Sequence, residues 1–211
     1  MHRLLIATKN AHKTAEIRAI LGDAWEITDL TAHPGVPAPD ETGATFEENA
    51  RIKAEAASRV FAGLVLSDDS GLEVDALGGA PGVNSARYAG EQGNDAANRA
   101  RLKRELAASG APEPWTARFR CAMAIAEAGR TTATFDGRVE GRVILEERGT
   151  SGFGYDALFI PAGYCETFGQ LASGVKNTLS HRSLALRKAV QTLVGFTKST
   201  DGISPGSMRR P

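Results

Sequence analysis

The sequence predicts an α/β protein with a mixed β-sheet and flanking helices. Short apolar runs of strand length alternate with segments whose apolar residues recur at helical spacing, and the middle of the chain is rich in strands. The 211 residues are 42% hydrophobic and 24% charged, which is ordinary for a folded protein with a substantial core. We therefore expect one two-lobed domain over residues 1–196.

The N-terminal part reads as a strand, a helix and a second strand. Residues 3–8, "RLLIAT", form a short apolar run, which is typical of a buried strand. Residues 11–22 carry apolar side chains at helical spacing and end at Gly22, a natural helix stop. Residues 25–30, "WEITDL", alternate between apolar and polar as a half-buried strand does.

A loop and a second helix follow. Residues 31–43 contain three prolines and two glycines, so they have no regular period and form a loop. Thr45 and Glu48 fit a capping box, in which each side chain bonds to the backbone of the other residue. The helix that they open is expected to end near Phe61.

The next segment predicts two strands, a loop and a helix. Residues 64–69, "LVLSDD", read as a buried strand, and residues 72–77 as a half-buried strand after a Ser-Gly turn. Residues 78–90 are loop-like because of their glycines and proline. Residues 94–109 read as a helix that ends at Gly110.

The remainder predicts a hairpin, a strand and a last helix. Residues 115–128 and 132–145 read as antiparallel strands, and residues 155–161, "YDALFIP", as another strand. Residues 183–196 form an amphipathic helix, whose expected apolar face is Leu186, Val190, Leu193 and Val194. Residues 197–211 lack apolar periodicity, so a disordered tail is expected there.

Composition excludes several classes of function. The formal net charge is zero, which gives no global attraction for nucleic acid or for anionic membranes. The basic stretch at residues 99–104, "RARLKR", is typical of a solvated helix face. No apolar stretch approaches the length of about 20 residues that spans a bilayer. Two cysteines, Cys121 and Cys165, make no disulfide framework, so we expect a cytoplasmic protein.

Polar residues follow the first predicted strand. In "ATKNAHK", residues 7–13, Lys9 and Lys13 flank Asn10 where a helix begins. Backbone N–H groups at such a helix start can bind an anion. The same pattern is also typical of a simple helix cap with two solvated lysines.

Two acidic pairs, Asp40-Glu41 and Asp68-Asp69, form the second group. Carboxylates that meet in one place repel one another, and a divalent cation such as Mg²⁺ relieves that repulsion while also binding phosphates. For Asp68-Asp69 an Asx-type turn is the alternative, although one aspartate would be enough for such a turn. The four histidines lack the spacing of zinc ligands.

Two C-terminal stretches complete the candidate site. In "SGFGYDALF", glycines on both sides of Phe153 allow backbone to approach a ligand while the ring offers a stacking face, although a tight turn with a core aromatic has the same pattern. In "KNTLSHRSLALRK", Ser180 can cap the last helix, which places His181 and Arg182 in its first turn. Cations there oppose the helix dipole unless an acceptor compensates, and a solvated helix start is the alternative.

Taken together, these motifs resemble those of the inosine triphosphate pyrophosphatase family. They are "TKNAHK", "ETGATFEENARIKA", "SDDSGLEVDALGGAPGVNSARYAG", "GFGYDALF" and "KNTLSHR", in this order over about residues 4–195. The resemblance implies an elongated mixed sheet with helices in two lobes around a deep cleft. It also implies a homodimer that uses Mg²⁺, with Mn²⁺ as a substitute, and hydrolyses non-standard purine nucleoside triphosphates to a monophosphate and pyrophosphate.

The resemblance also assigns roles. Asp69 would be the general base that activates the attacking water. The implied metal ligands are Glu41, Asp68 and Asp69, with Asp68 in a supporting role. The implied substrate-binding residues are Thr8, Lys9, Asn10, Ala11, His12, Lys13, Lys53, Ser70, Phe153, Gly154, Tyr155, Asp156, Lys176, His181 and Arg182. Of these, Phe153 would stack on the purine, and Lys176 and Arg182 would read its edge.

Two positions depart from the family pattern, and other functions stay open. Position 9 is Lys where Gly is common, and position 157 is Ala where Pro is usual. One alternative is a Maf-type pyrophosphatase, which has the same fold and acts on pyrimidine or modified nucleotides. Another is a non-catalytic nucleotide-binding or RNA-binding protein. An aspartyl-nucleophile phosphatase would need Asp-x-Asp, whereas Asp68 and Asp69 are adjacent.

Overall fold

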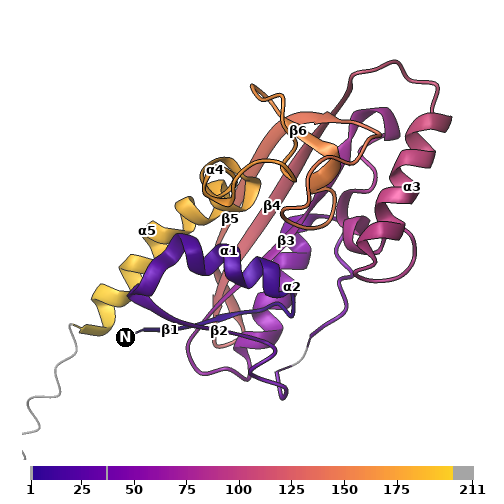
Figure 1. Cartoon of the computed structure of the whole chain (residues 1–211). Coiled ribbons are helices and arrows are strands. Elements are labelled where there is room, and N and C mark those ends of the chain that lie inside the picture. The colour runs from indigo at the N-terminus through magenta and orange to yellow at the C-terminus, as the bar shows by residue number, and fades with distance from the viewer. Residues whose placement is uncertain (1, 37, 202–211) are drawn as a thin grey trace, which may run out of the picture.

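The computed structural model describes residues 2–36 and 38–201, which form an elongated molecule (Figure 1). The strands are β1 (His2–Ile6), β2 (Trp25–Asp29), β3 (Leu64–Val74), β4 (Trp115–Glu127), β5 (Arg130–Val143) and β6 (Phe159–Pro161). The helices are α1 (Ala11–Leu21), α2 (Phe46–Ser58), α3 (Asp95–Ala108), α4 (Ser173–Leu179) and α5 (His181–Asp201). Two 3₁₀ turns matter for the cleft, namely η3 (Gly82–Arg87) and η4 (Asp156–Leu158).

One six-stranded mixed sheet, with the order β2-β1-β3-β4-β5-β6, organises the chain. Strand β1 runs parallel to β2 and β3, and the remaining neighbours are antiparallel. Helices α1 and α5 pack on one face around a core that includes Leu66, Met123 and Leu186, and α2 packs on the other face through Ala50 and Ala54. The predicted α/β class and mixed sheet are therefore confirmed.

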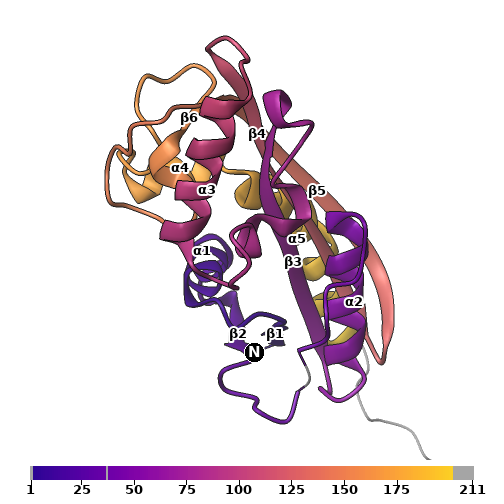
Figure 2. The same cartoon turned by 90° about the vertical axis from the view of Figure 1, so that its right-hand side faces the viewer.

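Strand β3 connects the two lobes. It pairs with β1 only at Leu64–Leu66 but continues beside β4 to Val74. The long β3-β4-β5 ribbon carries the second lobe, in which α3 and β6 enclose a separate core around Phe119 and Phe159 (Figure 2). Because β1 ends early, β3 has an edge beyond Leu66 that β1 does not cover, and the cleft described below lies along it.

The local signals at helix starts are confirmed. The side chain of Asn10 caps α1, and Thr45 and Glu48 form the capping box of α2. Asn94 caps α3 by accepting a hydrogen bond from the Ala97 N–H. Each cap satisfies backbone donors that the helix itself leaves unpaired.

Two expectations are wrong, and one helix was not predicted. Ser70 and Gly71 make no turn, because they pair with Cys121 and Arg120 of β4 and thereby continue β3. Residues 155–161 form a strand only from Phe159, since η4 takes up the preceding residues. Helix α4 is a seven-residue element that the sequence reading missed, and no side chain caps its start.

The last helix is longer than expected. It begins at His181 and continues through Asp201, so residues 197–201 belong to it and not to the predicted tail. The rest of that tail, residues 202–211, lies outside the described residues. Leu186 and Leu193 are buried as predicted, whereas Val194 is 40% exposed and does not belong to the buried face. Within the described part of the chain, no helix has the length and apolar character needed to cross a membrane.

Candidate functional site

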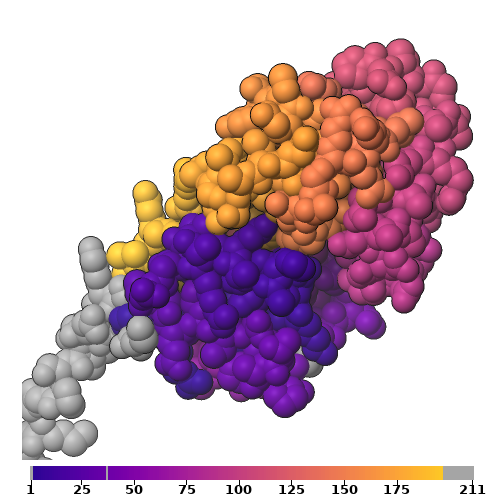
Figure 3. Space-filling view, viewed as in Figure 1, coloured from indigo at the N-terminus to yellow at the C-terminus, as the bar shows by residue number. Residues whose placement is uncertain are grey.

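A cleft of about 740 Å³ lies between the lobes, a volume in the usual range for small-molecule sites. In Figure 3 the indigo N-terminal segment and the magenta and orange segments meet along a recess. The structure brings the following predicted residues to the cleft lining: Thr8, Lys9, Asn10, Lys13, Glu41, Lys53, Asp69, Ser70, Phe153, Gly154, Tyr155, Asp156, Lys176, His181 and Arg182. The predicted residues Ala11, His12 and Asp68 do not line it.

The start of α1 forms one wall of the cleft. The Asn10 side chain accepts hydrogen bonds from the backbone N–H of His12, at 3.0 Å, and of Lys13, at 3.4 Å. Two backbone donors that an anion was expected to use are therefore already paired within the cap. The Lys13 ammonium lies 3.1 Å from Asp68 Oδ2. Anion binding at this end consequently depends on the lysine side chains more than on the helix amides.

Lys53 of α2 joins the two predicted metal-binding carboxylates. Its Nζ lies 2.7 Å from Glu41 Oε1 and 2.9 Å from Asp69 Oδ1. Burial raises the pKa of Asp69 and the charge of Glu41 raises it further, while Lys53 opposes both effects. Burial would also raise the pKa of Glu41, but Lys53 and the other nearby cations outweigh it, so that pKa is lowered.

Asn49 orients Asp69 and was missed from the sequence. Its Nδ2 donates to Asp69 Oδ2 at 3.3 Å, and its Oδ1 accepts from the Gly43 N–H at 2.8 Å. Asn49 is fully buried. Its position four residues before Lys53 puts both side chains on one face of α2, and this spacing is a signal that could have identified it.

Asp68 is placed apart from Glu41 and Asp69. Neighbouring residues of a strand face opposite sides of the sheet, and Asp68 accordingly meets Lys13 and Arg182 on the α1 and α5 side. Burial acts to raise the pKa of Asp68, but Lys13 and Arg182 outweigh it, so the pKa is lowered. Its Oδ1 is buried and lacks a hydrogen-bond partner. This geometry gives the predicted metal role of Asp68 no support and favours a role in holding Lys13 and Arg182.

Glu41 and Asp69 fit a hard divalent cation. Across residues 2–36 and 38–201, no three His, Cys, Asp or Glu side chains gather into a metal site of their own. Mg²⁺ commonly takes only one or two protein carboxylates and completes its shell with water and substrate phosphates. Two carboxylates that share one ammonium at the cleft wall match that requirement.

A buried cluster of charges forms the other end of the cleft. Lys176 Nζ lies 2.7 Å from Asp156 Oδ2 and 2.8 Å from Glu16 Oε1. Arg182 pairs with Glu16 and Asp68, and its Nη2 donates to Ser70 Oγ at 2.9 Å. Glu16 was missed from the sequence, although it follows Lys13 by three residues and so shares its face of α1. Glu16 thus joins the two cations that were predicted to read a purine edge.

Phe153 lies beside these cations. Its ring centroid is 5.2 Å from Lys176 Nζ and 5.6 Å from Arg182 Cζ. The His12 ring stacks on it at 5.3 Å with an interplanar angle of 14°. The backbone N–H of Phe153 donates to Asp156 Oδ2 at 2.9 Å, which fixes the loop. An aromatic face next to donors is the arrangement that binds a flat heterocycle.

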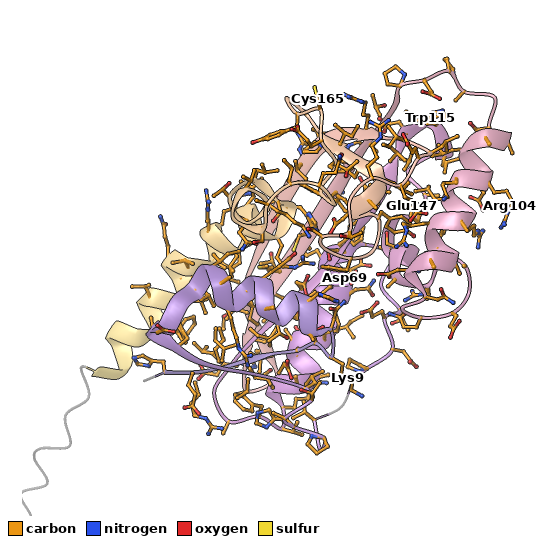
Figure 4. All side chains as sticks on the ribbon, in the orientation of Figure 1. Lys9, Asp69, Arg104, Trp115, Glu147 and Cys165 are labelled. Carbon is orange, nitrogen blue, oxygen red and sulfur yellow. The ribbon has the colours of Figure 1, made fainter. Side chains whose placement is uncertain are left out.

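Helix α3 holds the same loop from the far side. The Gly154 N–H donates to Asp95 Oδ2 at 2.7 Å, and the Gly154 carbonyl accepts from Arg99 Nη1 at 2.9 Å. The basic stretch at residues 99–104 is therefore only partly a solvated face. Arg99 fixes the loop, whereas Arg104 points away from the body of the molecule in Figure 4. The same figure places Asp69 in the middle, between the lobes, and Lys9 on the N-terminal lobe.

His181 is a buried, neutral member of the cleft. Burial and the adjacent charges of Arg182 and Lys176 lower its pKa well below the ordinary value. Its ring stacks on Phe119 with centroids 4.9 Å apart, and its Nδ1 has no hydrogen-bond partner. A polar atom buried without a partner is costly, and burial keeps this imidazole uncharged.

The cleft therefore combines two capacities. One end offers an aromatic face with fixed donors, and the other offers cations next to two carboxylates. The first suits a heterocyclic base and the second suits a phosphate chain with its cation. Asp69, with its raised pKa, is placed to accept a proton between them.

Comparisons with known proteins agree with these features. Residues 4–192 match the Ham1 family. A dITP/XTP pyrophosphatase of Bacillus licheniformis is 49% identical over 189 residues, which cover 89% of this chain and 96% of the relative. The protein of the same name from Bacillus subtilis is 45% identical over 194 residues, 92% of this chain and 98% of the relative.

Solved structures give the same result. The structure of a HAM1 protein from Coxiella burnetii superimposes with a TM-score of 0.81 at 36% identity, covering 92% of this chain and 100% of that one. The Staphylococcus aureus Ham1 protein gives 0.80 at 34% identity, covering 92% and 99%. These matches confirm the resemblance inferred from the motifs. From its motifs, its fold and its relatives, this chain belongs to the Ham1 family.

Proposed function

We propose that this protein hydrolyses non-standard purine nucleoside triphosphates, namely ITP, dITP and XTP, to the monophosphate and pyrophosphate. The observation that carries the proposal is the juxtaposition in one cleft of the Phe153 ring with its cations and the Asp69-Lys53-Glu41 array. The name dITP/XTP pyrophosphatase of relatives that match nearly their whole length supports it. The reaction would keep such bases out of DNA and RNA.

The residues divide the chemistry between them. Asp69 accepts a proton from the water that attacks the α-phosphorus, and Asn49 keeps its carboxylate oriented. Lys53 and Lys13 stabilise the negative charge that grows on the phosphates as the bond to the leaving pyrophosphate breaks. Glu41 and Asp69 would hold Mg²⁺, or Mn²⁺ in its place, which supplies further neutralisation of that charge.

Selectivity arises at the buried end. Hypoxanthine and xanthine carry an oxygen acceptor at position 6, whereas adenine carries an amino donor there. The donors of Lys176 and Arg182 complement the oxygen and leave an adenine amino group facing other donors. His181, which lines the same part of the cleft, stays uncharged there because its pKa is lowered by burial and by the charges of Arg182 and Lys176.

The alternatives have no observation in their favour. Relatives named dITP/XTP pyrophosphatase, which match over nearly their whole length, favour a purine substrate over the pyrimidine or modified nucleotides of a Maf-type pyrophosphatase. A binding protein would not call for a carboxylate with a raised pKa held beside Lys53 in the cleft.

Pyrophosphate release from a panel of nucleoside triphosphates, with Mg²⁺ and with a chelator, tests the proposal. We expect metal-dependent release from dITP, ITP and XTP, with ATP and GTP nearly untouched. Release only from pyrimidine nucleotides would support the Maf-type alternative. No release from any nucleotide would leave a binding protein.

Assembly and location are further predictions. We expect a homodimer in the cytoplasm, on the basis of the family resemblance, and no partnership with nucleic acid or membrane. Light scattering coupled to gel filtration measures the mass in solution. A mass equal to the chain's 22.3 kDa would contradict the dimer.

A further inference from the structure

Arg87 lines the cleft, and neither the motif roles nor the chemistry above uses it. It is the last residue of η3, which packs against β3. Its side chain is 34% exposed, whereas that of Arg182 is 1% exposed. The side chain of Arg87 is therefore more accessible to a ligand than that of Arg182, which the protein encloses.

The backbone that carries Arg87 is anchored from several sides. Ser85 Oγ accepts from the Leu72 N–H at 2.9 Å and donates to the Gly82 carbonyl at 2.6 Å. The Tyr155 hydroxyl donates to the Ser85 carbonyl at 2.8 Å. A Cβ at Gly71 would lie 2.3 Å from Ser85 Oγ, so glycine is what lets the turn sit this close to β3. A residue on such a support presents its side chain from a fixed base.

The guanidinium, in contrast, is held only weakly. Nη1 lies 3.4 Å from Glu41 Oε2, and Nη2 lies 3.5 Å from the Glu41 carbonyl. Both distances are at the long limit for a hydrogen bond, and a guanidinium has five donors. Most of the donor capacity of Arg87 is thus directed at the cleft without a strong protein acceptor.

Arg87 also completes a line of alternating charges. Glu41 contacts Arg87 through Oε2 and Lys53 through Oε1, and Lys53 contacts Asp69. Glu41 is the only carboxylate partner of Arg87 among the described residues, so Arg87 would lose it if Glu41 turned to a cation that arrives with the substrate. Its planar fork then matches the paired oxygens of a phosphate, an arrangement that a lysine cannot reproduce.

We propose that Arg87 binds the phosphate chain of the nucleotide substrate, and that it exchanges its contact with Glu41 for this phosphate contact. This inference rests on the proposed function and deepens it by adding a residue that contacts the substrate. The ligand is a polyphosphate, and inorganic pyrophosphate serves as its probe.

The test measures pyrophosphate binding by calorimetry in Mg²⁺ buffer, together with kcat and KM for dITP. The proteins are the wild type, Arg87→Ala, Arg87→Lys and the control Arg138→Ala. Arg138 is also an arginine but is 68% exposed and lies on β5. Arg87→Ala should weaken pyrophosphate binding and lower kcat/KM by about tenfold or more, as expected for a charge-assisted hydrogen bond. Arg87→Lys should recover part of the loss, and Arg138→Ala should behave as the wild type.

Measurements in Glu41→Gln protein distinguish phosphate binding by Arg87 from a purely structural role, in which Arg87 only holds Glu41. In Glu41→Gln protein the Arg87→Ala change should still weaken pyrophosphate binding. If that loss disappears in the Glu41→Gln background, or if Arg87→Ala binds pyrophosphate as the wild type does, the inference is wrong. Circular dichroism confirms folding of each variant, and Arg87→Lys carries the test if Arg87→Ala fails to fold.

The outcome also distinguishes this inference from the proposed function. If the wild type hydrolyses dITP and Arg87→Ala binds pyrophosphate as well as the wild type does, only the role of Arg87 is overturned. Wild-type protein that binds pyrophosphate through Arg87 but hydrolyses no nucleotide would overturn the proposed function and leave the phosphate contact standing.

Discussion

The two ends of the cleft hold their charges in different ways. The inner cluster (Glu16, Asp68, Asp156, Lys176 and Arg182) is nearly closed to solvent, since none of its side chains is more than 16% exposed. The outer chain (Asp69, Lys53, Glu41 and Arg87) becomes steadily more exposed toward its end, from 8% at Asp69 to 34% at Arg87. The inner cluster is held by short ion pairs, although Asp68 Oδ1 has no hydrogen-bond partner, whereas the outer chain ends in long contacts.

This difference indicates that the inner cluster is suited to recognising a base, whereas the outer chain is suited to rearranging around a ligand. A buried charge is tolerated only when partners surround it, so the inner cluster has one arrangement and can present fixed donors to a base. A partly exposed charge exchanges partners at little cost, because water compensates while it moves. The outer chain can therefore rearrange around phosphates and a cation.

The largest effect is expected from Asp69→Asn, which removes the proposed base from the outer chain. We expect kcat to fall by about 10³-fold, within the range usual for general-base catalysis. The amide keeps the size of the side chain, so folding should persist. Steady-state kinetics with dITP measures the loss. Asp136→Asn, at an exposed position on β5, is the matched control, and an Asp69→Asn enzyme with wild-type kcat would refute the assignment.

Arg182→Met should break the inner cluster and reduce stability. It leaves Asp68, which is fully buried, with Lys13 as its remaining cation. Breaking a buried ion pair on one side costs about 3–5 kcal/mol in the free energy of unfolding. Arg87→Met in the outer chain should change it by less than about 1 kcal/mol, because exposed ion pairs contribute little. Urea unfolding compares the two, and equal losses would remove the distinction between the ends.

Glu16→Gln should reduce base selectivity without abolishing turnover. The change removes the negative charge that Lys176 and Arg182 share, so their orientation toward the base loosens. We expect the preference for dITP over dATP, expressed as a ratio of kcat/KM values, to shrink by about tenfold, the worth of one well-formed charged hydrogen bond. An unchanged ratio would show that Glu16 does not position the base readers.

The pH profile reports on the outer chain. Asp69 must be ionised to accept a proton, and its pKa is raised, so kcat/KM should fall as the pH drops through that pKa. Lys53 opposes this rise. In Lys53→Gln protein the acid limb should therefore move to higher pH. A limb that stays in place, or moves to lower pH, would mean that a different group controls it.

Lys9→Gly should have the smallest effect. Among the described residues, none lies within ion-pair distance of the exposed Lys9 ammonium, so it adds only a screened attraction for the phosphates. We expect KM for dITP to rise about two- to threefold at low salt, consistent with the modest energy of exposed charges, and the difference to vanish at high salt. A larger rise that persists in salt would indicate a direct phosphate contact.

Sequence reasoning succeeded where the deciding interactions are local. The capping box at Thr45 and Glu48 and the Asn10 cap both depend on residues three or fewer positions apart, and both are confirmed. The predicted Ser-Gly turn failed for the opposite reason. Its local turn preference is overridden because β4 offers Ser70 and Gly71 a continuous ladder of hydrogen bonds from a distant part of the chain.

In the cleft, too, local signals were predicted better than contacts between distant parts of the chain. Polar motifs at strand ends and the family resemblance together predicted many of the polar residues that line the cleft. Arg87 was missed because its partner Glu41 lies far along the chain. Glu16 and Asn49 also act through distant partners, and only their helical spacing from Lys13 and Lys53 indicated them in the sequence. The family resemblance implied a supporting metal role for Asp68, whereas the alternation of β3 places Asp68 on the opposite face from Asp69, where it meets Lys13 and Arg182.

By itself, then, the sequence determined the α/β class, the main helices and strands, and the chemical types that meet in the cleft. Periodicity and caps carry that information because they act over a few residues. The packing of the folded chain sets which charges are buried among short ion pairs and which stay partly exposed. That outcome depends on where β1 stops beside β3 and on which cations α1 and α5 bring to Asp68, since burial and partner number set the energy of a charge.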